Sequence, residues 1–554
     1  MFDYAALNFQ QIASGGWVRN CGGATTLSYL TEIQTGPGSI EFAGERFPFV
    51  SQHWDGMLLN KRNAPAHQWV LRAVRFAVLV TIGAATWVRA DHRPPDIVVF
   101  ITDDLSARSL PLYGGQDIRT TAIDRLASRG LTFDAAFVAS PSCAPSRAAW
   151  LTGQMPLRNG AQDNHSYPAD AAPRLPRLLN RLGYQTAAFG KVAHGKSASD
   201  YDFEFIKADS SISGLRSNLA EFFEQRDDHR PLALFVGTAS PHVPWPESLP
   251  ELEQDITPES LHLPPTQIDT PRTRVQRSRY LSEVAELDGL LDDVLGWTDR
   301  HLSDDAIKVF TSDHGAQFPF GKWTLYDEGI RVPMIIAAPG ITPPASRSDA
   351  MVSLIDVIPT LVDVVDAEHQ SGLADLNLDG RSFTKVMRNP DTPHREFVFA
   401  THTGDRMMNV YPSRCVRSAT HKLIYNPHPE FAFTTHIDLL RRETSGDYFN
   451  QWVQRAGIDA NAKAILDRYH ARPRYELYDL NADPYEQNNL YDADAVDGPQ
   501  RELKRTLDRW LEASADPLAV LHEPLHLDAP ETWVPRKPAT RKTTSATKSR
   551  KVSK

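Results

Sequence analysis

Cysteine is scarce in this sequence. The 554 residues include three cysteines, Cys21, Cys143 and Cys415. So few thiols in so long a chain cannot form the disulfide framework of a small secreted domain. The fold must therefore depend on a hydrophobic core, and a buried structural thiol is the default interpretation for each cysteine.

A surplus of basic residues is also missing. Lys and Arg total 59 against 69 Asp and Glu, which gives a formal net charge of −10 at pH 7. This acidic balance argues against nucleic acid as the main partner. The chain is too long for one compact core, so we expect a large domain and a smaller one.

No apolar run reaches the roughly twenty residues that a membrane-spanning helix needs. The most apolar stretch, "FAVLVTIGAATWV" at 76–88, is shorter, has two arginines before it and leads into the small-x-small pattern "VRA". This layout is typical of a secretory signal peptide. We expect a signal peptide at 57–90 that starts at Met57, no stable membrane span, and an exported, periplasmic or secreted protein that begins near Asp91. The alternative is a buried core helix.

The two ends of the chain differ in composition from the rest. Residues 1–56 show no clear periodicity and are interpreted as a spurious extension. Residues 536–554 contain eight basic residues, no acidic ones and almost nothing apolar. That composition is typical of a disordered tail, with contact to a polyanion as the alternative.

Between the two ends, short apolar runs alternate with helical patterns. "DIVVFI" at 96–101 is continuously apolar and β-branched, as expected of a buried parallel strand. Further strands are expected at 232–242, 306–315 and 332–340, and helices at 121–130, stopping on Gly130, and at 278–300. The alternation predicts an α/β domain at 91–385, with a large, mostly parallel sheet flanked by helices. The short strands and final helix that follow predict a smaller C-terminal α+β domain at 386–535.

Acidic residues follow two of the expected strands. Asp103 and Asp104 come after the first, and Asp313 and His314 follow the strand near residue 310. Ligands gather beyond the carboxyl ends of strands in open α/β sheets, and adjacent buried carboxylates are costly without a cation. Three carboxylates favour a hard ion, Ca²⁺ or Mg²⁺, over zinc. Each motif alone is more typical of a strand-to-turn junction; their joint occurrence favours a metal site.

Cys143 has the neighbours of a reactive thiol. It lies in "SPSCAPSRAAWLTG" at 140–153, where a stretch of helical propensity begins. The N-terminus of a helix favours negative charge through its free N–H groups and its macrodipole. Arg147, four residues later, can reach back to stabilise an oxyanion.

These residues carry a family resemblance. "CAPSR" followed by "LTG" resembles the signature of the type I sulfatases, and "GKVAHG" at 190–195 is also sulfatase-like. "FPFGKWTLY" and the stretches at 411–426 and 472–490 are most similar to the heparan N-sulfatase, or sulfamidase, branch. The resemblance covers nearly all of 96–524 and implies the alkaline-phosphatase-like sulfatase fold.

The resemblance also implies the cofactors and the site. Cys143 would be oxidised to Cα-formylglycine by a formylglycine-generating enzyme. One divalent ion, Ca²⁺ before Mg²⁺, would be held by Asp103, Asp104, Asp313, His314 and the modified Cys143. The implied catalytic residues besides Cys143 are Arg147, Lys191, His194, His242 and Lys322. Taken singly, Lys191 and Lys322 are equally typical of surface lysines, and His242 of a turn.

Several positions depart from the family pattern. His314 stands where Asn is frequent, and an imidazole nitrogen is a weaker Ca²⁺ ligand than an amide oxygen. Whether His314 binds the metal or borders it therefore stays open. Lys322 stands where the sulfamidase branch is expected to have Arg, two residues rather than one separate Lys191 from His194, and "LTGQ" replaces L-T-G-R.

The predicted function is hydrolysis of sulfate esters or sulfamates on sulfated glycans, with N-sulfoglucosamine-type units as the first candidate. His402 and Arg406 could approach the sugar, although surface loop residues are the simpler interpretation. Three alternatives stay open. They are an O-sulfatase of another polysaccharide or aryl sulfate, a phosphomonoester or phosphonate ester hydrolase of the same superfamily, and an inactive glycan-binding protein.

Overall fold

The computed structural model describes residues 93–533 except 195–196, 248–253, 367–370 and 496, and also three short N-terminal strands. These strands are β1 (Gln34–Gly36), β2 (Ser39–Phe42) and β3 (Glu45–Pro48). β2 pairs antiparallel with both of the others. The expected signal peptide at 57–90 and the basic tail at 536–554 lie outside the described residues, as does most of the 1–56 extension.

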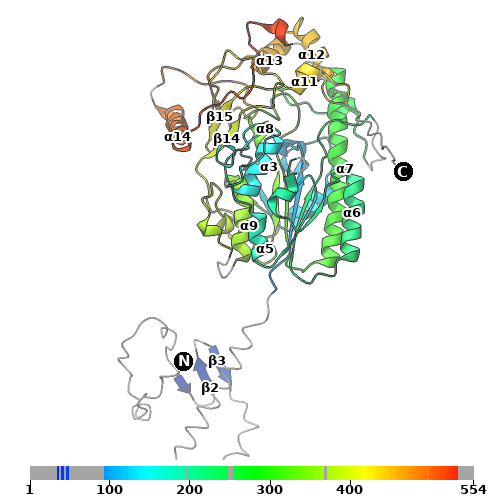
Figure 1. Cartoon of the computed structure of the whole chain (residues 1–554), viewed down its shortest axis with the longest axis vertical. Helices are drawn as coiled ribbons and strands as arrows, with labels where there is room; N and C mark the ends of the chain where they lie inside the picture. Colours follow the sequence, from blue (N-terminus) through cyan, green and yellow to red (C-terminus); the bar gives the residue numbers. More distant parts are fainter. Residues whose placement is uncertain are drawn as a thin grey trace, which may run out of the picture. The chain divides into compact units, whose positions relative to one another are not determined.

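An eight-stranded sheet forms the centre of the fold (Figure 1). Its strands, in spatial order, are β12 (Ser346–Ser348), β5 (Leu131–Phe133), β11 (Met334–Ala337), β10 (Ile307–Ser312), β4 (Ile97–Thr102), β9 (Leu232–Gly237), β7 (Gln185–Gly190) and β8 (Phe205–Lys207). β11 runs antiparallel to both neighbours, whereas the other pairings are parallel. The predicted α/β class with a mostly parallel sheet is therefore confirmed.

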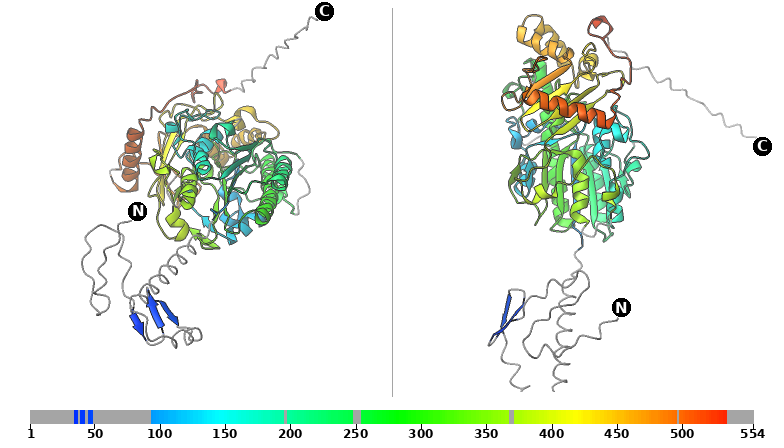
Figure 2. Two further views of the ribbon diagram at one scale, coloured as in Figure 1. Left: turned by 60° about the horizontal axis from the view of Figure 1, so that its bottom comes forward. Right: turned by 90° about the vertical axis from the view of Figure 1, so that its left-hand side faces the viewer.

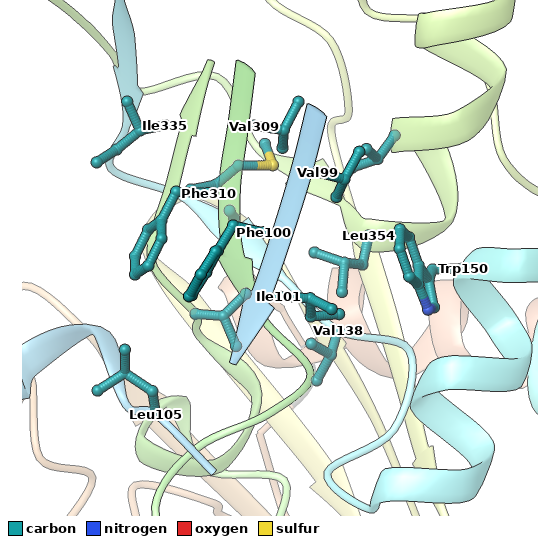
Figure 3. Close-up of a cluster of buried hydrophobic side chains, with 14 of the residues drawn as sticks. Val99, Phe100, Ile101, Leu105, Val138, Trp150, Val309, Phe310, Ile335 and Leu354 are labelled. Atoms are coloured by element: carbon teal, nitrogen blue, oxygen red, sulfur yellow. The ribbon is translucent and has the colours of Figure 1, made fainter. Parts of the chain in front are cut away.

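Strand β4 is buried on both of its faces, as its continuous apolar sequence predicts. Figure 3 shows Phe100 beside Phe310 on one face, with ring centroids 6.0 Å apart. Val99 lies on the opposite face, toward Trp150. Because side chains alternate along a strand, one six-residue segment packs against two helical layers.

Helices cover both faces of this sheet. The long helices α6 (Ile212–Gln225) and α7 (Pro271–His301) lie on one face, and α3 (Cys143–Thr152), α5 (Pro176–Arg181) and α9 (Val357–Val365) lie on the other (Figure 1). Shorter helices occupy connections: α4 (Pro156–Asn159), α8 (Asp327–Ile330) and α10 (Thr384–Arg388). α7 begins with Thr270 accepting a hydrogen bond from the Thr273 N–H, a favourable N-cap.

The helix expected at 121–130 ends two residues early. α2 covers Thr121–Ser128. Gly130 does not stop the helix through a left-handed conformation. It lies against β11, where a Cβ atom would be 2.3 Å from the carbonyl oxygen of Ile336. Glycine is therefore required there for close backbone approach.

A second, antiparallel sheet of four strands follows in the chain. Its order is β14 (Val398–His402), β15 (Ser413–Arg417), β16 (His421–Tyr425) and β17 (Tyr475–Asp479). Helix α14 (Gly498–Ser514) packs Leu503 and Leu507 on it, and Figure 2 shows this helix lying across the strands. The short helices α11 (His436–Leu440), α12 (Tyr448–Ala456) and α13 (Ala460–His470) lie between β16 and β17 in sequence. Both sheets belong to one compact unit that starts at Arg93, so the boundary at 385 stays a prediction.

A buried ion-pair cluster joins the second sheet to α8. Asp327, the first residue of α8, binds Arg417 of β15 and lies 2.6 Å from the Nζ of Lys422 on β16. Lys422 also lies 2.8 Å from Glu486, and its side chain is 0% exposed. Burial raises the pKa of Asp327, but Arg417 and Lys422 outweigh burial and hold this pKa well below its usual range. Along the described part of the chain, no helix is long and apolar enough to cross a membrane.

Replacing Lys422 with Met should destabilise the protein strongly. The substitution leaves Asp327 and Glu486 buried with less counter-charge, a change that costs about 3–5 kcal/mol in free energy of unfolding. Urea denaturation followed by tryptophan fluorescence measures it. The matched control is Lys463→Met, which removes an exposed i,i+4 pair with Asp467 and should have little effect. Equal free energies of unfolding for the two variants would show that Lys422 does not stabilise the fold by compensating Asp327 and Glu486.

Candidate active site

The acidic motifs meet because β4 and β10 are in parallel register. Thr102 pairs with Ser312, so Asp103 and Asp313 are the next residues on neighbouring strands. The Asp313 N–H donates to the Thr102 carbonyl at 3.2 Å, and the Asp104 N–H donates to Asp313 Oδ1 at 3.1 Å. All three carboxylates, including that of Asp104, are 0% exposed. Such a group of buried charges requires cations nearby.

Two lysines neutralise these carboxylates. Lys191 follows β7 directly and its Nζ binds Asp103 Oδ2. The Lys322 Nζ contacts both oxygens of Asp104, at 2.8 and 2.9 Å. Burial raises the pKa of Asp103, but Lys191 and the other cations outweigh it and the pKa is lowered. Neither lysine is the surface residue that its sequence context alone would suggest.

Arg147 connects helix α3 to both strand ends. Its Nε donates to Asp313 at 2.9 Å, and one terminal nitrogen reaches Asp103 at 3.3 Å and the Thr102 carbonyl at 3.1 Å. The other terminal nitrogen binds the Lys191 carbonyl. The guanidinium is completely buried and fully engaged with these groups.

Cys143 is the first residue of α3, as its sequence context predicts. Its Sγ lies 3.7 Å from the Lys191 Nζ and 3.3 Å from the His314 Nε2. Burial raises the pKa of this thiol, but Lys191, Lys322 and His314 outweigh burial and hold it well below its usual value. Helix α3 ends at Gly153 with a φ of +67°, a left-handed conformation that favours glycine and explains the final residue of "LTG".

The ring of His314 is oriented by the backbone. Its Nδ1 lies 3.0 Å from the Gly315 carbonyl and donates to it, which directs Nε2 toward the carboxylates. Nε2 lies 3.5 Å from Asp104 and 3.6 Å from Asp313. Burial lowers the pKa of His314, but Asp313 and its neighbours raise it to about 9. The surrounding carboxylates therefore favour the protonated form of this ring.

Two more predicted histidines border the cluster. His242 follows β9 and its Nε2 lies 3.9 Å from Asp104. His194 lines the same pocket as Cys143, and its Nε2 lies 2.8 Å from the Nδ1 of His165. The structure thus brings together every candidate residue that the sequence analysis named for catalysis or metal binding.

Several residues of the site were not predicted. Asn164 accepts a hydrogen bond from the Ala144 N–H in the first turn of α3, and donates to Asp405 at 3.0 Å. Asp405 also accepts from the Trp323 Nε1 at 3.0 Å and lies 3.6 Å from His165. The "GDR" turn after β14 holds Asp405, yet no spacing in the sequence connects it to Cys143.

His402 and Arg406, which the sequence analysis suggested for sugar contact, do not line the pocket. His402 is 1% exposed and binds Ser142 and Asn409, and burial lowers its pKa to about 4. It supports the residue before Cys143 and does not line the pocket. Arg406 is exposed and also lies outside the pocket lining. The hydrogen-bonding surroundings of β14, invisible in sequence, account for the burial of His402.

A pocket of about 250 Å³ opens at Cys143. Cys143 and Lys322 form its buried end. The rest of the lining comprises four histidines, one acid, part of the segment at 440–445 and five further residues: His165, His194, His242, His436, Asp405, Leu440, Arg442, Thr444, Ser445, Asn164, Val243, Pro244, Gln317 and Trp323. Ligand atoms of two overlapping residue groups lie within 4.8 Å of one another: Asp103, Cys143, Asp313 and His314; and Asp103, Asp104, Cys143 and His242. The site therefore combines a polar pocket with a possible metal centre.

Two family models match this chain. The model described as Sulfatase matches residues 95–367, and that described as N-sulphoglucosamine sulphohydrolase, C-terminal, matches residues 314–439. The chain belongs to the sulfatase family. The matched ranges include every cluster residue described above.

Curated relatives agree with this assignment, and a solved structure agrees with the fold. An ulvan-active sulfatase of Formosa agariphila is 26% identical over 77% of this chain and 81% of its own. The human N-sulphoglucosamine sulphohydrolase is 28% identical over 77% of this chain and 91% of its own. The structure of BT4656 in complex with its substrate D-glucosamine-2-N,6-O-disulfate has a TM-score of 0.57 at 20% identity, covering 77% of this chain and 99% of that one. The sulfatase is thus an enzyme of the sulfuric ester hydrolase class.

In protein produced without modification of Cys143, this thiol should react faster than Cys415. Nearby cations hold the pKa of Cys143 well below its usual value and so favour its thiolate, whereas burial raises the pKa of Cys415 to about 12. Thiolates are the reactive species, so we expect more than about a tenfold difference in rate. Iodoacetamide labelling followed by peptide mass spectrometry measures both sites in one sample. Equal labelling of the folded protein would contradict the expected ionisation.

Proposed function

We propose that this sulfatase removes sulfate groups from sulfated glycans, with N-sulfoglucosamine-type units as the first candidate. The observation that carries the proposal is the position of Cys143, at the buried end of a sugar-sized pocket between Lys191 and Lys322. The similarity to the human N-sulphoglucosamine sulphohydrolase and the C-terminal family match support the choice of sugar.

We propose further that Cys143 is converted to formylglycine by a formylglycine-generating enzyme. Formylglycine at this position would supply an oxygen nucleophile for the sulfur atom and a second hydroxyl that lets sulfate leave. The position of Cys143 supports this role, because a helix N-terminus and two ammonium groups stabilise negative charge at this side chain.

The residues present fit a divalent ion. Asp103, Asp104 and Asp313 supply hard oxygen donors, and the His314 Nε2 already faces them. Ca²⁺ is the first candidate and Mg²⁺ the second. A bound ion would polarise a sulfate oxygen and favour ionisation of the nucleophile. Binding would require His314 to lose its proton if the ring is a ligand.

The other polar side chains have separable roles. Lys191 and Lys322 offset the anionic oxygens of the sulfate, which otherwise repel a nucleophile. Arg147 holds Asp103 and Asp313 in place from α3.

His242 is positioned to protonate the departing alcohol or amine. Burial and Lys322 lower the pKa of His242, but Asp104 and Asp103 outweigh them and raise it. His194, which lines the same pocket as Cys143, accepts the proton when sulfate is released.

Export remains part of the proposal. The signal-peptide pattern at 57–90 supports a periplasmic or secreted enzyme, a location suited to extracellular polysaccharide.

A substrate panel tests the proposed function. Glucosamine-2-N-sulfate, glucosamine-6-O-sulfate, an aryl sulfate and an aryl phosphate are compared by anion release. We expect the N-sulfated sugar to have the highest kcat/KM, and peptide mass spectrometry to find an aldehyde at residue 143. Cys143→Ser should lose nearly all turnover, because a serine ester cannot expel sulfate by the same route.

Cys415→Ser is the matched control, because Cys415 lies outside the pocket and should be replaceable with little loss of turnover. Faster sulfate release from the 6-O-sulfated than from the N-sulfated sugar would overturn the choice of sugar. Faster phosphate release from the aryl phosphate than sulfate release from any sulfated substrate would overturn the proposal that sulfate is the group removed. Full activity with an unmodified thiol at residue 143 would overturn the formylglycine mechanism.

Metal binding has its own test. Asp313→Asn should lower the bound Ca²⁺ per chain, measured by elemental analysis after dialysis, and reduce turnover by about 100-fold or more. Asp438→Asn, a buried carboxylate in α11 outside the cluster, serves as the control. Unchanged metal content in Asp313→Asn, or full activity after complete chelation, would contradict the metal site.

A further inference from the structure

Arg442 lies at the exposed end of the pocket that contains Cys143. It belongs to the loop after α11, and its backbone carbonyl accepts N–H groups from Ser445, Gly446 and Asp447 at 3.1, 2.8 and 3.0 Å. Three hydrogen bonds to one carbonyl fix the backbone of this loop. The side chain of Arg442 is exposed, yet it contributes to the pocket wall.

The guanidinium of Arg442 has no acidic partner in the part of the chain that the structure describes. Within the described residues, no carboxylate forms an ion pair with it. The one acid of the pocket lining, Asp405, is buried and already accepts hydrogen bonds from Asn164 and Trp323. The neighbouring carboxylate of Asp447 binds Arg272 and Gln276. Lys322, the other permanent cation of the lining, is engaged with Asp104.

His436 provides a second polar group on the same wall. Its ring stacks on Trp323 with centroids 5.4 Å apart, and its side chain is 32% exposed. Its buried Nδ1 has no hydrogen-bond partner in the part of the chain that the structure describes. Burial is the largest cause of its lowered pKa, and the charge of Arg442 also contributes. Although Asp405, 3.7 Å from Nδ1, opposes this shift, the net lowering favours the neutral ring, which offers a hydrogen bond beside a cation.

We propose that Arg442, together with His436, binds a second acidic group of the substrate, so that the enzyme prefers doubly acidic sugars. This inference rests on the proposed function, because the first acidic group is the sulfate removed at Cys143. A guanidinium presents two parallel N–H groups that match the oxygens of a sulfate or a carboxylate. The second group is therefore a sulfate on the same sugar or the carboxylate of an adjoining uronic acid.

Three substrates distinguish these sources. They are glucosamine-2-N-sulfate, glucosamine-2-N,6-O-disulfate, and a disaccharide of N-sulfoglucosamine and a uronic acid. A hydrogen-bonded charge pair contributes enough binding free energy for about a 10–100-fold change in affinity. We expect kcat/KM for at least one doubly acidic substrate to exceed that of the monosulfated sugar by this factor, mainly through KM.

Arg442→Gln should bring that ratio close to one, again through KM, and Arg442→Lys should restore part of it because the charge returns without the planar fork. Arg441→Gln is the matched control: its guanidinium binds the Asp438 carbonyl and Asn450 and does not line the pocket, so the ratio should persist.

The outcomes separate the two proposals. The role of Arg442 is overturned if the ratio of kcat/KM between doubly acidic and monosulfated substrates is near one in the wild-type protein, or if it persists in Arg442→Gln. Either result leaves the sulfatase proposal intact. Sulfate release from none of the three sugars overturns both proposals. Preference for the disulfated monosaccharide identifies a second sulfate, and preference for the disaccharide identifies a carboxylate.

Discussion

Three carboxylates buried in one place are the constraint on which the site depends. Asp103, Asp104 and Asp313 are brought together by the register of β4 with β10, and water cannot solvate them. Each negative charge must therefore be matched by a cation delivered from another element. Lys191 comes from the end of β7 and Lys322 from the loop after β10, so chain segments far apart in sequence are held at one point by charge.

The same requirement explains the position of Cys143. Arg147 contacts two of the carboxylates from α3, so the helix cannot move without separating buried charges. Because Cys143 is the first residue of that helix, its side chain is fixed beside the cluster. The cations that neutralise the carboxylates also lower the pKa of the thiol. The same set of charges therefore holds α3 in place and lowers the pKa of the Cys143 thiol.

The sequence allowed the buried end of this site to be predicted, because its residues follow apolar strands and occur in short motifs. The parallel sheet and the adjacency of Asp103 and Asp313 could be inferred in this way. The pocket wall could not. Asn164 and Asp405 meet across 241 residues, and their hydrogen bond depends on packing that no local pattern encodes. The position of His402 has the same origin: the apolar run at 397–400 indicates a strand, but nothing in it shows that the histidine at its end binds Ser142 and Asn409 instead of facing the pocket.

Pocket chemistry and pocket shape thus come from different parts of the fold. The buried end is built on strand ends, where backbone hydrogen bonds and ion pairs leave little freedom. The exposed end includes the loop after α11, and within the described residues Arg442 of that loop forms no ion pair with the cluster. Substitutions in that loop can change which sugar fits without disturbing the groups that act on the sulfate. An arginine that forms no ion pair within the described residues is consistent with such a division, because these contacts give no stability-based reason for its presence at a pocket edge.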